Sequence, residues 1–219
     1  MRPCVVMLDC DGTLVDSQGH IAAVFNETIT AFGYEPVKPD AVYRVIGLSL
    51  DDAIGRLLPD CPASRRQGLV NAYRARYALD VAGKNPLYEG VRGFLDAVHR
   101  EGRWMAMATG KSLTGALRVV AEHGLSPYFP IIKTGDVCRP KPDPDMLLQI
   151  LDELGLPPER AIMVGDTTFD VDMASAAGVR AVGLTCGAHG REELALAGAH
   201  LVLDRLSDLA PHLDRLLPA

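Results

Sequence analysis

Two aspartates, Asp9 and Asp11, directly follow a run of four apolar residues, Val5 to Leu8. An unbroken apolar run bounded by turn residues is typical of a strand buried on both faces of a parallel sheet. The carboxyl ends of such strands border the ligand crevice of open α/β sheets, and Gly12 lets the backbone turn there. Because neighbouring carboxylates repel each other, a hard cation such as Mg²⁺ is one way to hold them together.

An Asp-x-Asp-Gly sequence on its own also fits a solvated turn or the first part of a calcium-binding loop. A calcium loop needs a glutamate at its twelfth position, and the twelfth residue counted from Asp9 is His20. The calcium interpretation therefore fails. Three further polar strand ends make a mere solvated turn unfavourable: Thr109-Gly110-Lys111, Lys141, and Gly165-Asp166 with the residues up to Asp170.

The elements that must position these residues fall into two parts of the chain. Between about residues 18 and 83, apolar residues at helical spacing predict four helices with short loops, the third capped by Ser49 and the fourth by Ser64. After Asn85-Pro86, helices alternate with strands, and Asp143 is expected to cap one of these helices. The strands are expected at 104–108, 130–132, 161–164, 179–184 and 200–203.

Alternating strands and helices predict an α/β fold built on a doubly wound parallel sheet. We expect residues 1–16 and 85–219 to form the α/β core, and residues 17–84 to form a helical domain inserted after the first strand. The chain of 219 residues is long enough for such a core with an insertion.

Composition argues against several classes of partner. The net charge of -6, from 22 Lys and Arg against 28 Asp and Glu, disfavours nucleic acid. No stretch approaches the length of a membrane span, and the first apolar run is too short for a secretion signal. Five cysteines without paired spacing predict reduced thiols, with Cys10 pointing away from the acids. We therefore expect a cytoplasmic monomer or homodimer that binds neither nucleic acid nor membrane.

Taken together, in this order and on these elements, the four polar strand ends resemble the motifs of the haloacid dehalogenase-like superfamily. The similarity covers nearly the whole chain, including a helical cap after the first motif, and is greatest to the phosphoglycolate phosphatase and β-phosphoglucomutase branch. It implies a Rossmann-like core and a Mg²⁺-dependent phosphatase that acts on a small phosphorylated metabolite through an aspartyl phosphate. Phosphoglycolate is the first candidate substrate.

The resemblance also implies roles for the acids. Asp9 matches the nucleophile, and Asp11 matches the general acid and base. Mg²⁺ would be held by Asp9, by Asp11 through its backbone carbonyl, and by Asp166. Asp170, one helical turn after Asp166, is expected to hold the metal-binding residues in place, and its direct binding to the ion is left open.

Phosphate binding would involve Gly12, Thr109, Gly110 and Lys141. The Thr109 hydroxyl and the Gly110 amide would donate hydrogen bonds to the phosphate, and Lys141 would supply positive charge; Thr109 and Lys141 are therefore counted as catalytic. Gly110 departs from the common pattern, because relatives often have Asn or Ser there. Lys111 could also assist the phosphate, but at the start of an expected helix it is expected to be solvated.

The inserted helices carry less information about substrate. Relatives place substrate-facing residues in the turn that corresponds to Gly47-Leu48-Ser49. Arg44 and Arg56 have the charge to meet a substrate carboxylate, but as helix residues they are expected to be solvated.

Other activities fit parts of the pattern. A phosphosugar mutase of the β-phosphoglucomutase type, or a pyrophosphatase, would use the same nucleophile. A phosphonate hydrolase would need a lysine in the cap, where Lys38 and Lys84 both fall in expected loops. A phospho-aspartate signalling receiver shares the strand-end acids but needs neither the acid at Asp11 nor an inserted helical bundle.

Overall fold

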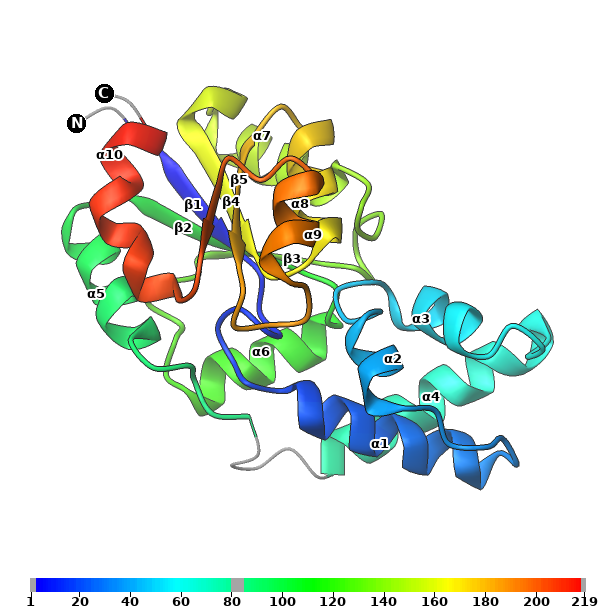
Figure 1. The fold of residues 1–219 in the computed structure, drawn as a ribbon. Helices are drawn as coiled ribbons and strands as arrows, with labels where there is room; N and C mark the ends of the chain where they lie inside the picture. The colour runs from blue at the N-terminus through cyan, green and yellow to red at the C-terminus, as the bar shows by residue number, and fades with distance from the viewer. Residues whose placement is uncertain (1–2, 80–84, 218–219) are drawn as a thin grey trace.

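The computed structural model describes residues 3–79 and 85–217. Six parallel strands form a sheet in the order β3-β2-β1-β4-β5-β6, seen in Figure 1. The strands are β1 (Val5–Leu8), β2 (Trp104–Thr109), β3 (Ile131–Thr134), β4 (Ala161–Gly165), β5 (Arg180–Leu184) and β6 (Leu201–Leu203). Strand β1 pairs with both β2 and β4, so its carboxyl end lies where the strand order reverses, the usual ligand site of such sheets.

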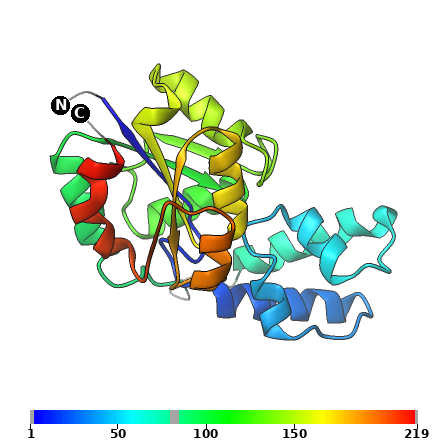
Figure 2. The ribbon, with the colours of Figure 1, turned by 45° about the horizontal axis from the view of Figure 1, so that its top comes forward.

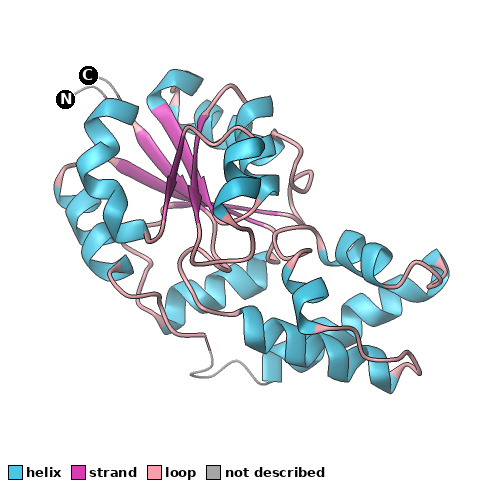
Figure 3. Ribbon diagram, viewed as in Figure 1, coloured by secondary structure: helices cyan, strands magenta, loops and turns pink. Residues whose placement is uncertain are grey.

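Helices cover both faces of the sheet, as Figure 3 shows. One face packs on α5 (Val91–Arg100), α6 (Leu113–Glu122), the 3₁₀ helix η2 (Leu206–His212) and α10 (Leu213–Leu216). The other packs on α7 (Asp145–Leu154), α8 (Thr168–Ala176) and α9 (Arg191–Leu196), with a short 3₁₀ helix, η1 (Pro158–Arg160), before β4. Successive residues of β1 enter opposite clusters, which explains why all four are apolar.

Four helices between β1 and β2 form a separate group, here called the helical insertion. They are α1 (Gln18–Ala31), α2 (Pro39–Tyr43), α3 (Leu50–Leu57) and α4 (Ala63–Leu79). They pack on one another around their own apolar cluster, which includes Phe25, Ile29, Ile54 and Leu69. Figures 1 and 2 show the helical insertion beside the core, beyond the carboxyl ends of the strands.

The chain enters and leaves the helical insertion through two neighbouring segments. The amide of Asp16 donates to the carbonyl of Pro86 at 2.9 Å, and the amide of Tyr88 donates to the carbonyl of Leu14 at 3.0 Å. The insertion is thus attached to the core by a paired stem. The predicted domain boundary at residue 84, and Lys84 itself, lie outside the described residues.

Several boundaries differ from the prediction. Helix α4 begins at Ala63, so Ser64 lies inside the helix and is not its cap. Helix α7 begins at Asp145 with Pro144 at the cap position, one residue later than the predicted cap Asp143, although the Asp143 carboxylate still accepts from the Asp145 amide. Helix α9 was not predicted; its six residues are too few to show a periodic pattern.

The cysteines are free thiols, as predicted, and Cys10 is buried in the core. Among the described helices, none has both the length and the apolar character of a membrane span.

Candidate active site

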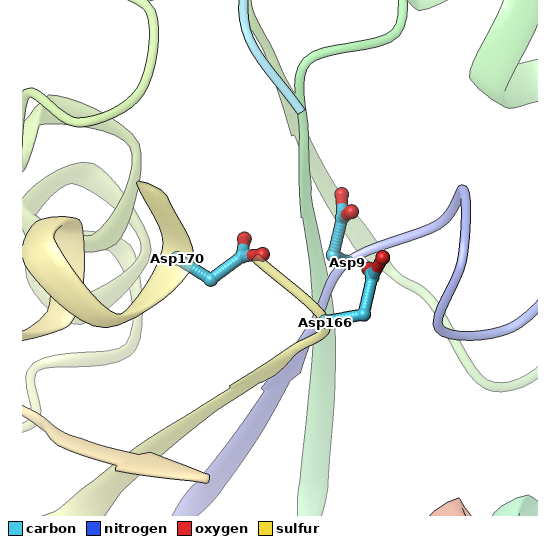
Figure 4. Close-up of side chains that lie close together, drawn as sticks. All are labelled: Asp9, Asp166 and Asp170. Carbon is cyan, nitrogen blue, oxygen red and sulfur yellow. The ribbon is translucent and has the colours of Figure 1, made fainter. Parts of the chain in front are cut away.

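Three buried carboxylates meet at the carboxyl edge of the sheet. Asp9 follows β1, Asp166 follows β4, and Asp170 lies in the first turn of α8, with its side chain directed towards the other two in Figure 4. One oxygen from each lies within 4.8 Å of the others, and all three side chains are essentially inaccessible. The predicted nucleophile and two predicted metal-site acids therefore form one cluster.

Lys141 is the cation that lies in this cluster. It is 1% exposed, and its Nζ lies 2.8 Å from Asp9 Oδ1 and 2.6 Å from Asp170 Oδ1. The other oxygen of Asp170 accepts from the Thr167 amide at 3.1 Å and the Thr167 hydroxyl at 2.7 Å. Both oxygens of Asp170 are thus engaged, and this residue holds Lys141 against the start of α8.

Negative charge exceeds positive charge in this buried site. Burial raises the pKa of Asp9 to about 6, although the attraction of Lys141 opposes the rise. Burial, followed by the nearby charge of Asp9, raises the pKa of Asp166 well above its usual range. Burial would lower the pKa of Lys141, but the charges of Asp170 and Asp9 raise it.

The open oxygens of Asp9 fit a bound cation. Neither accepts a hydrogen bond, because the Lys141 ammonium, although close to Oδ1, does not meet the geometry of one. A buried carboxylate with unshared oxygens beside a second carboxylate suits a small, hard divalent cation. Asp9 and Asp166 are the residues placed to hold it.

Two loops close around Asp166. Its oxygens accept from the Thr13 hydroxyl at 2.9 Å and from the Ala188 amide at 2.8 Å. A Cβ on Gly12, whose φ is +78°, would lie 2.2 Å from Asp166 Oδ2, and a Cβ on Gly187 would lie 2.0 Å from it. Gly12, predicted to bind phosphate, therefore stands against Asp166. The loop after β5 was not predicted as part of the site. Gly187, a glycine shortly after the end of a strand, could have indicated it.

Asp11 points to different partners. Its Oδ1 accepts from the Ser17 hydroxyl at 2.6 Å, and its Oδ2 lies 2.9 Å from Lys111 Nζ. Ser17 is fully buried at the cap position of α1, yet its side chain makes no capping bond. Its hydroxyl instead orients Asp11. No sequence pattern distinguishes this serine from an ordinary helix cap.

The prediction that Lys111 is solvated is wrong. Its side chain is 9% exposed, and its Nζ lies 5.0 Å from the centre of the Tyr77 ring as well as beside Asp11. Burial would lower the pKa of Lys111, but the charge of Asp11 raises it well above its usual range. The ion pair with Asp11 and the face of an aromatic ring together offset the cost of burying the ammonium. Lys111 therefore belongs to the site.

Gly110 is where the helical insertion lies on the core. A Cβ on Gly110 would stand 2.5 Å from the carbonyl oxygen of Gly47 and 2.9 Å from that of Leu48. Thr109, just before it, is buried at the end of β2, and its hydroxyl accepts from the Lys111 amide at 3.3 Å. Only glycine permits this approach of two backbones, which gives the departure at Gly110 a steric reason.

The three residues of the turn at Gly47-Leu48-Ser49 make different contacts. Gly47 and Leu48 line the cavity described below, whereas Ser49 caps α3 by accepting from the Asp52 amide at 3.2 Å. Leu48 also packs with Phe169 of the core.

Two exposed arginines join the helical insertion to the core. Arg44 lies 2.6 Å from Glu193 Oε1 of α9, and the guanidinium of Arg56 lies 5.3 Å from the centre of the Phe169 ring. Both are exposed, as expected, but each contacts the core. Exposed contacts of this kind contribute little to stability.

A cavity of about 420 Å³ lies between core and helical insertion. Asp9, Asp11, Thr109, Gly110 and Lys111 line its core end together with residues of α6 and Asp136, and residues of the helical insertion line the remainder. Lys141 is fully buried behind Asp9. The structure thus brings the predicted nucleophile, the predicted acid and two of the predicted phosphate-binding residues, Thr109 and Gly110, to one end of a single chamber.

Comparison with known proteins agrees with this arrangement. Residues 6–184 match the family described as haloacid dehalogenase-like hydrolase. The chain is 32% identical to "Probable phosphatase IndB" of Dickeya dadantii, over 95% of this chain and 92% of that protein. It is 33% identical to phosphoglycolate phosphatase 1 of Pseudomonas aeruginosa, over 97% and 80% respectively. The crystal structure of a hydrolase from Pseudomonas syringae superposes with a TM-score of 0.88 at 26% identity, covering 97% of this chain and 98% of that one.

We expect Mg²⁺ to raise the melting temperature by roughly 5 to 10 °C at a hundredfold excess over its Kd, because it neutralises buried carboxylates only in the folded state. The measurement is thermal unfolding with and without Mg²⁺. Asp166→Asn should lose this increase, whereas Asp172→Asn, an exposed acid on α8, should keep it. An unchanged increase in Asp166→Asn would exclude Asp166 as a metal ligand.

Proposed function

The chain belongs to the haloacid dehalogenase-like hydrolases and is a phosphatase, and from this premise we propose that it hydrolyses a small phosphorylated metabolite with Mg²⁺, through an aspartyl phosphate on Asp9. The observation that carries this proposal is the buried cluster of Asp9, Asp166 and Lys141 at one end of a chamber that Asp11 also lines. Phosphoglycolate is the first substrate to test, because similar proteins carry that name.

Asp9 is the proposed nucleophile. An oxygen without a hydrogen-bond partner is available to attack phosphorus, and the bond from phosphorus to the leaving oxygen breaks as the new one forms. Lys141, 2.8 Å from Asp9, places positive charge beside the attacking group and the transferring phosphoryl. Thr109 and the Gly110 amide would bind the phosphoryl oxygens. Mg²⁺, held by Asp9 and Asp166, would neutralise phosphoryl charge.

Asp11 is the proposed acid and base. It would give a proton to the leaving oxygen, and would then take one from the water that attacks phosphorus, so that phosphate leaves and the Asp9 carboxylate is regenerated. Ser17 and Lys111 hold its two oxygens, which fixes the direction of the carboxyl group. The proton transfers therefore start from an oriented group.

The helical insertion, within residues 17–84, is the proposed cap that closes the chamber over the phosphate. Its contacts with the core include Gly47 and Leu48 on Gly110, Arg44 with Glu193, and Arg56 with Phe169. A cap that excludes water protects the aspartyl phosphate until Asp11 activates the hydrolytic water.

Replacing Asp9 with Asn should abolish turnover of a chromogenic phosphate monoester, because an amide cannot form the acyl phosphate. Uncatalysed hydrolysis is slower by up to ~10²¹, so no background reaction would replace it. The assay is kcat with Mg²⁺, together with the mass of acid-quenched enzyme, where only the unaltered chain should carry a phosphoryl group. Asp172→Asn is the matched control, and residual activity above about a few per cent in Asp9→Asn would contradict the covalent mechanism.

Asp11→Asn separates acid and base catalysis from metal binding. We expect kcat to fall by roughly 10²–10⁴, while the Mg²⁺-dependent rise in melting temperature persists, because the Asp11 side chain is bonded to Ser17 and Lys111. Parallel loss of turnover and of the thermal shift would instead make its side chain a metal ligand.

Gly110→Ala tests the closed position of the cap. The added methyl would meet two backbone carbonyls that cannot rotate away, so the loop at Gly47 must withdraw. A displacement of about 1 Å in such a site costs on the order of 100-fold in kcat/KM. Gly93→Ala, whose methyl would meet nothing within 4 Å, is the control and should retain full activity. Equal activity of both variants would show that closure at Gly110 is not required.

A further inference from the structure

The part of the chamber formed by the helical insertion is apolar. Among the described residues of the insertion that line it, Arg74 is the one with a charged side chain, and it is exposed; the others are aliphatic, aromatic or glycine. Ile21, Phe25 and Leu57 are representative. Apolar lining with a few polar groups at one end is typical of sites that bind an apolar ligand group and orient it by its polar end.

Aromatic rings form one wall of this part. Tyr73 and Tyr77 stack with their centres 5.6 Å apart, and Phe25 lies 6.5 Å from Tyr73. The Tyr77 hydroxyl accepts from Nδ2 of the Asn85 side chain at 2.9 Å, which fixes the Tyr77 ring. Burial raises the pKa of Tyr73 well above its usual range, so this wall stays uncharged at neutral pH. Flat, neutral ring faces suit aromatic or aliphatic groups.

Of the cations that line the chamber, Lys111 and Arg118 are engaged by protein groups, and Arg74 is exposed to solvent. Lys111 is paired with Asp11, and Arg118 donates to the carbonyl of Ala78 at 2.9 Å. A glycolate carboxylate entering the insertion side would have to lose water against apolar walls, which is costly without a paired charge. The two-carbon glycolate group would also leave most of the 420 Å³ unfilled.

The reacting groups set the direction of the leaving group. With phosphate at Asp9, the leaving oxygen must reach Asp11, and Lys111 beside Asp11 lies against the Tyr77 ring. Whatever is attached to that oxygen continues past Lys111 towards the rings of α4. We infer that this phosphatase acts on phosphate monoesters whose leaving group is a bulky apolar or aromatic alcohol, bound among Phe25, Tyr73 and Tyr77. The inference rests on the proposed function and narrows its substrate class.

The test is kcat/KM for ethyl, hexyl and 2-phenylethyl phosphate and for phosphoglycolate, measured by release of inorganic phosphate. The three alcohols have similar acidity, so differences report binding of the leaving group. Each buried methylene contributes about fourfold, so hexyl and 2-phenylethyl phosphate should exceed ethyl phosphate on the order of 100-fold. Both should also exceed phosphoglycolate.

A filled-cavity variant checks where the group binds. Ala75 of α4 lines the chamber and is exposed, so Ala75→Trp narrows the chamber without entering the packed core. It should lower kcat/KM for 2-phenylethyl phosphate by about tenfold or more and leave ethyl phosphate within about twofold. Ala63→Trp, at an exposed alanine of the same helix that does not line the chamber, should change neither.

The outcomes separate the inference from the function on which it rests. Equal kcat/KM for ethyl and 2-phenylethyl phosphate, or a clear preference for phosphoglycolate, would overturn the apolar leaving group and leave the phosphatase standing. An equal loss on all esters in Ala75→Trp would also count against it. No hydrolysis of any monoester would remove the proposed function and the inference together.

Discussion

The buried charges at the carboxyl edge of the sheet are the constraint on which the rest of the site depends. Three carboxylates form a buried cluster, and the Lys141 ammonium pairs with two of them, Asp9 and Asp170. Removing one member of such a buried pair typically costs about 3–5 kcal/mol. Both oxygens of Asp170 are engaged, one by Lys141 and the other by Thr167, whereas the oxygens of Asp9 in the same cluster accept no hydrogen bond. An excess of buried negative charge is what a bound divalent cation can balance.

Because these charged side chains are crowded together, the backbone next to them has room only for glycine. A Cβ at Gly165 would lie 2.2 Å from Asp170 Cγ, and those at Gly12 and Gly187 would be equally close to Asp166. The acids can be buried side by side because three separate backbones approach without side chains of their own. At Gly110 the lack of a side chain likewise lets the backbone of the helical insertion approach the core. Glycine therefore serves both the packing of the buried acids and the contact between insertion and core.

The sequence predicted the strand ends because parallel strands bring distant carboxyl ends to one edge, so order and spacing sufficed for Asp9, Asp166 and Lys141. It did not predict contacts made across the fold. Lys111 has the pattern of a solvated helix start, and its burial depends on Asp11 and Tyr77, which are far away in sequence. The Ala188 amide likewise bonds Asp166 through a backbone group, which no residue type reveals.

The paired stem at Leu14–Tyr88 and Asp16–Pro86 bears on how the chain folds. Val5 of β1 pairs with Trp104 of β2, and the chain between them is a long loop. Closing this loop carries an entropic cost that slows the pairing of the two strands. The intervening helices have their own apolar cluster, and once they pack, the chain on either side of them is already adjacent. The loop that the first strand pair must then close is an ordinary parallel crossover through α5, without the inserted helices, so prior collapse of the inserted helices lowers the entropic cost of forming the sheet.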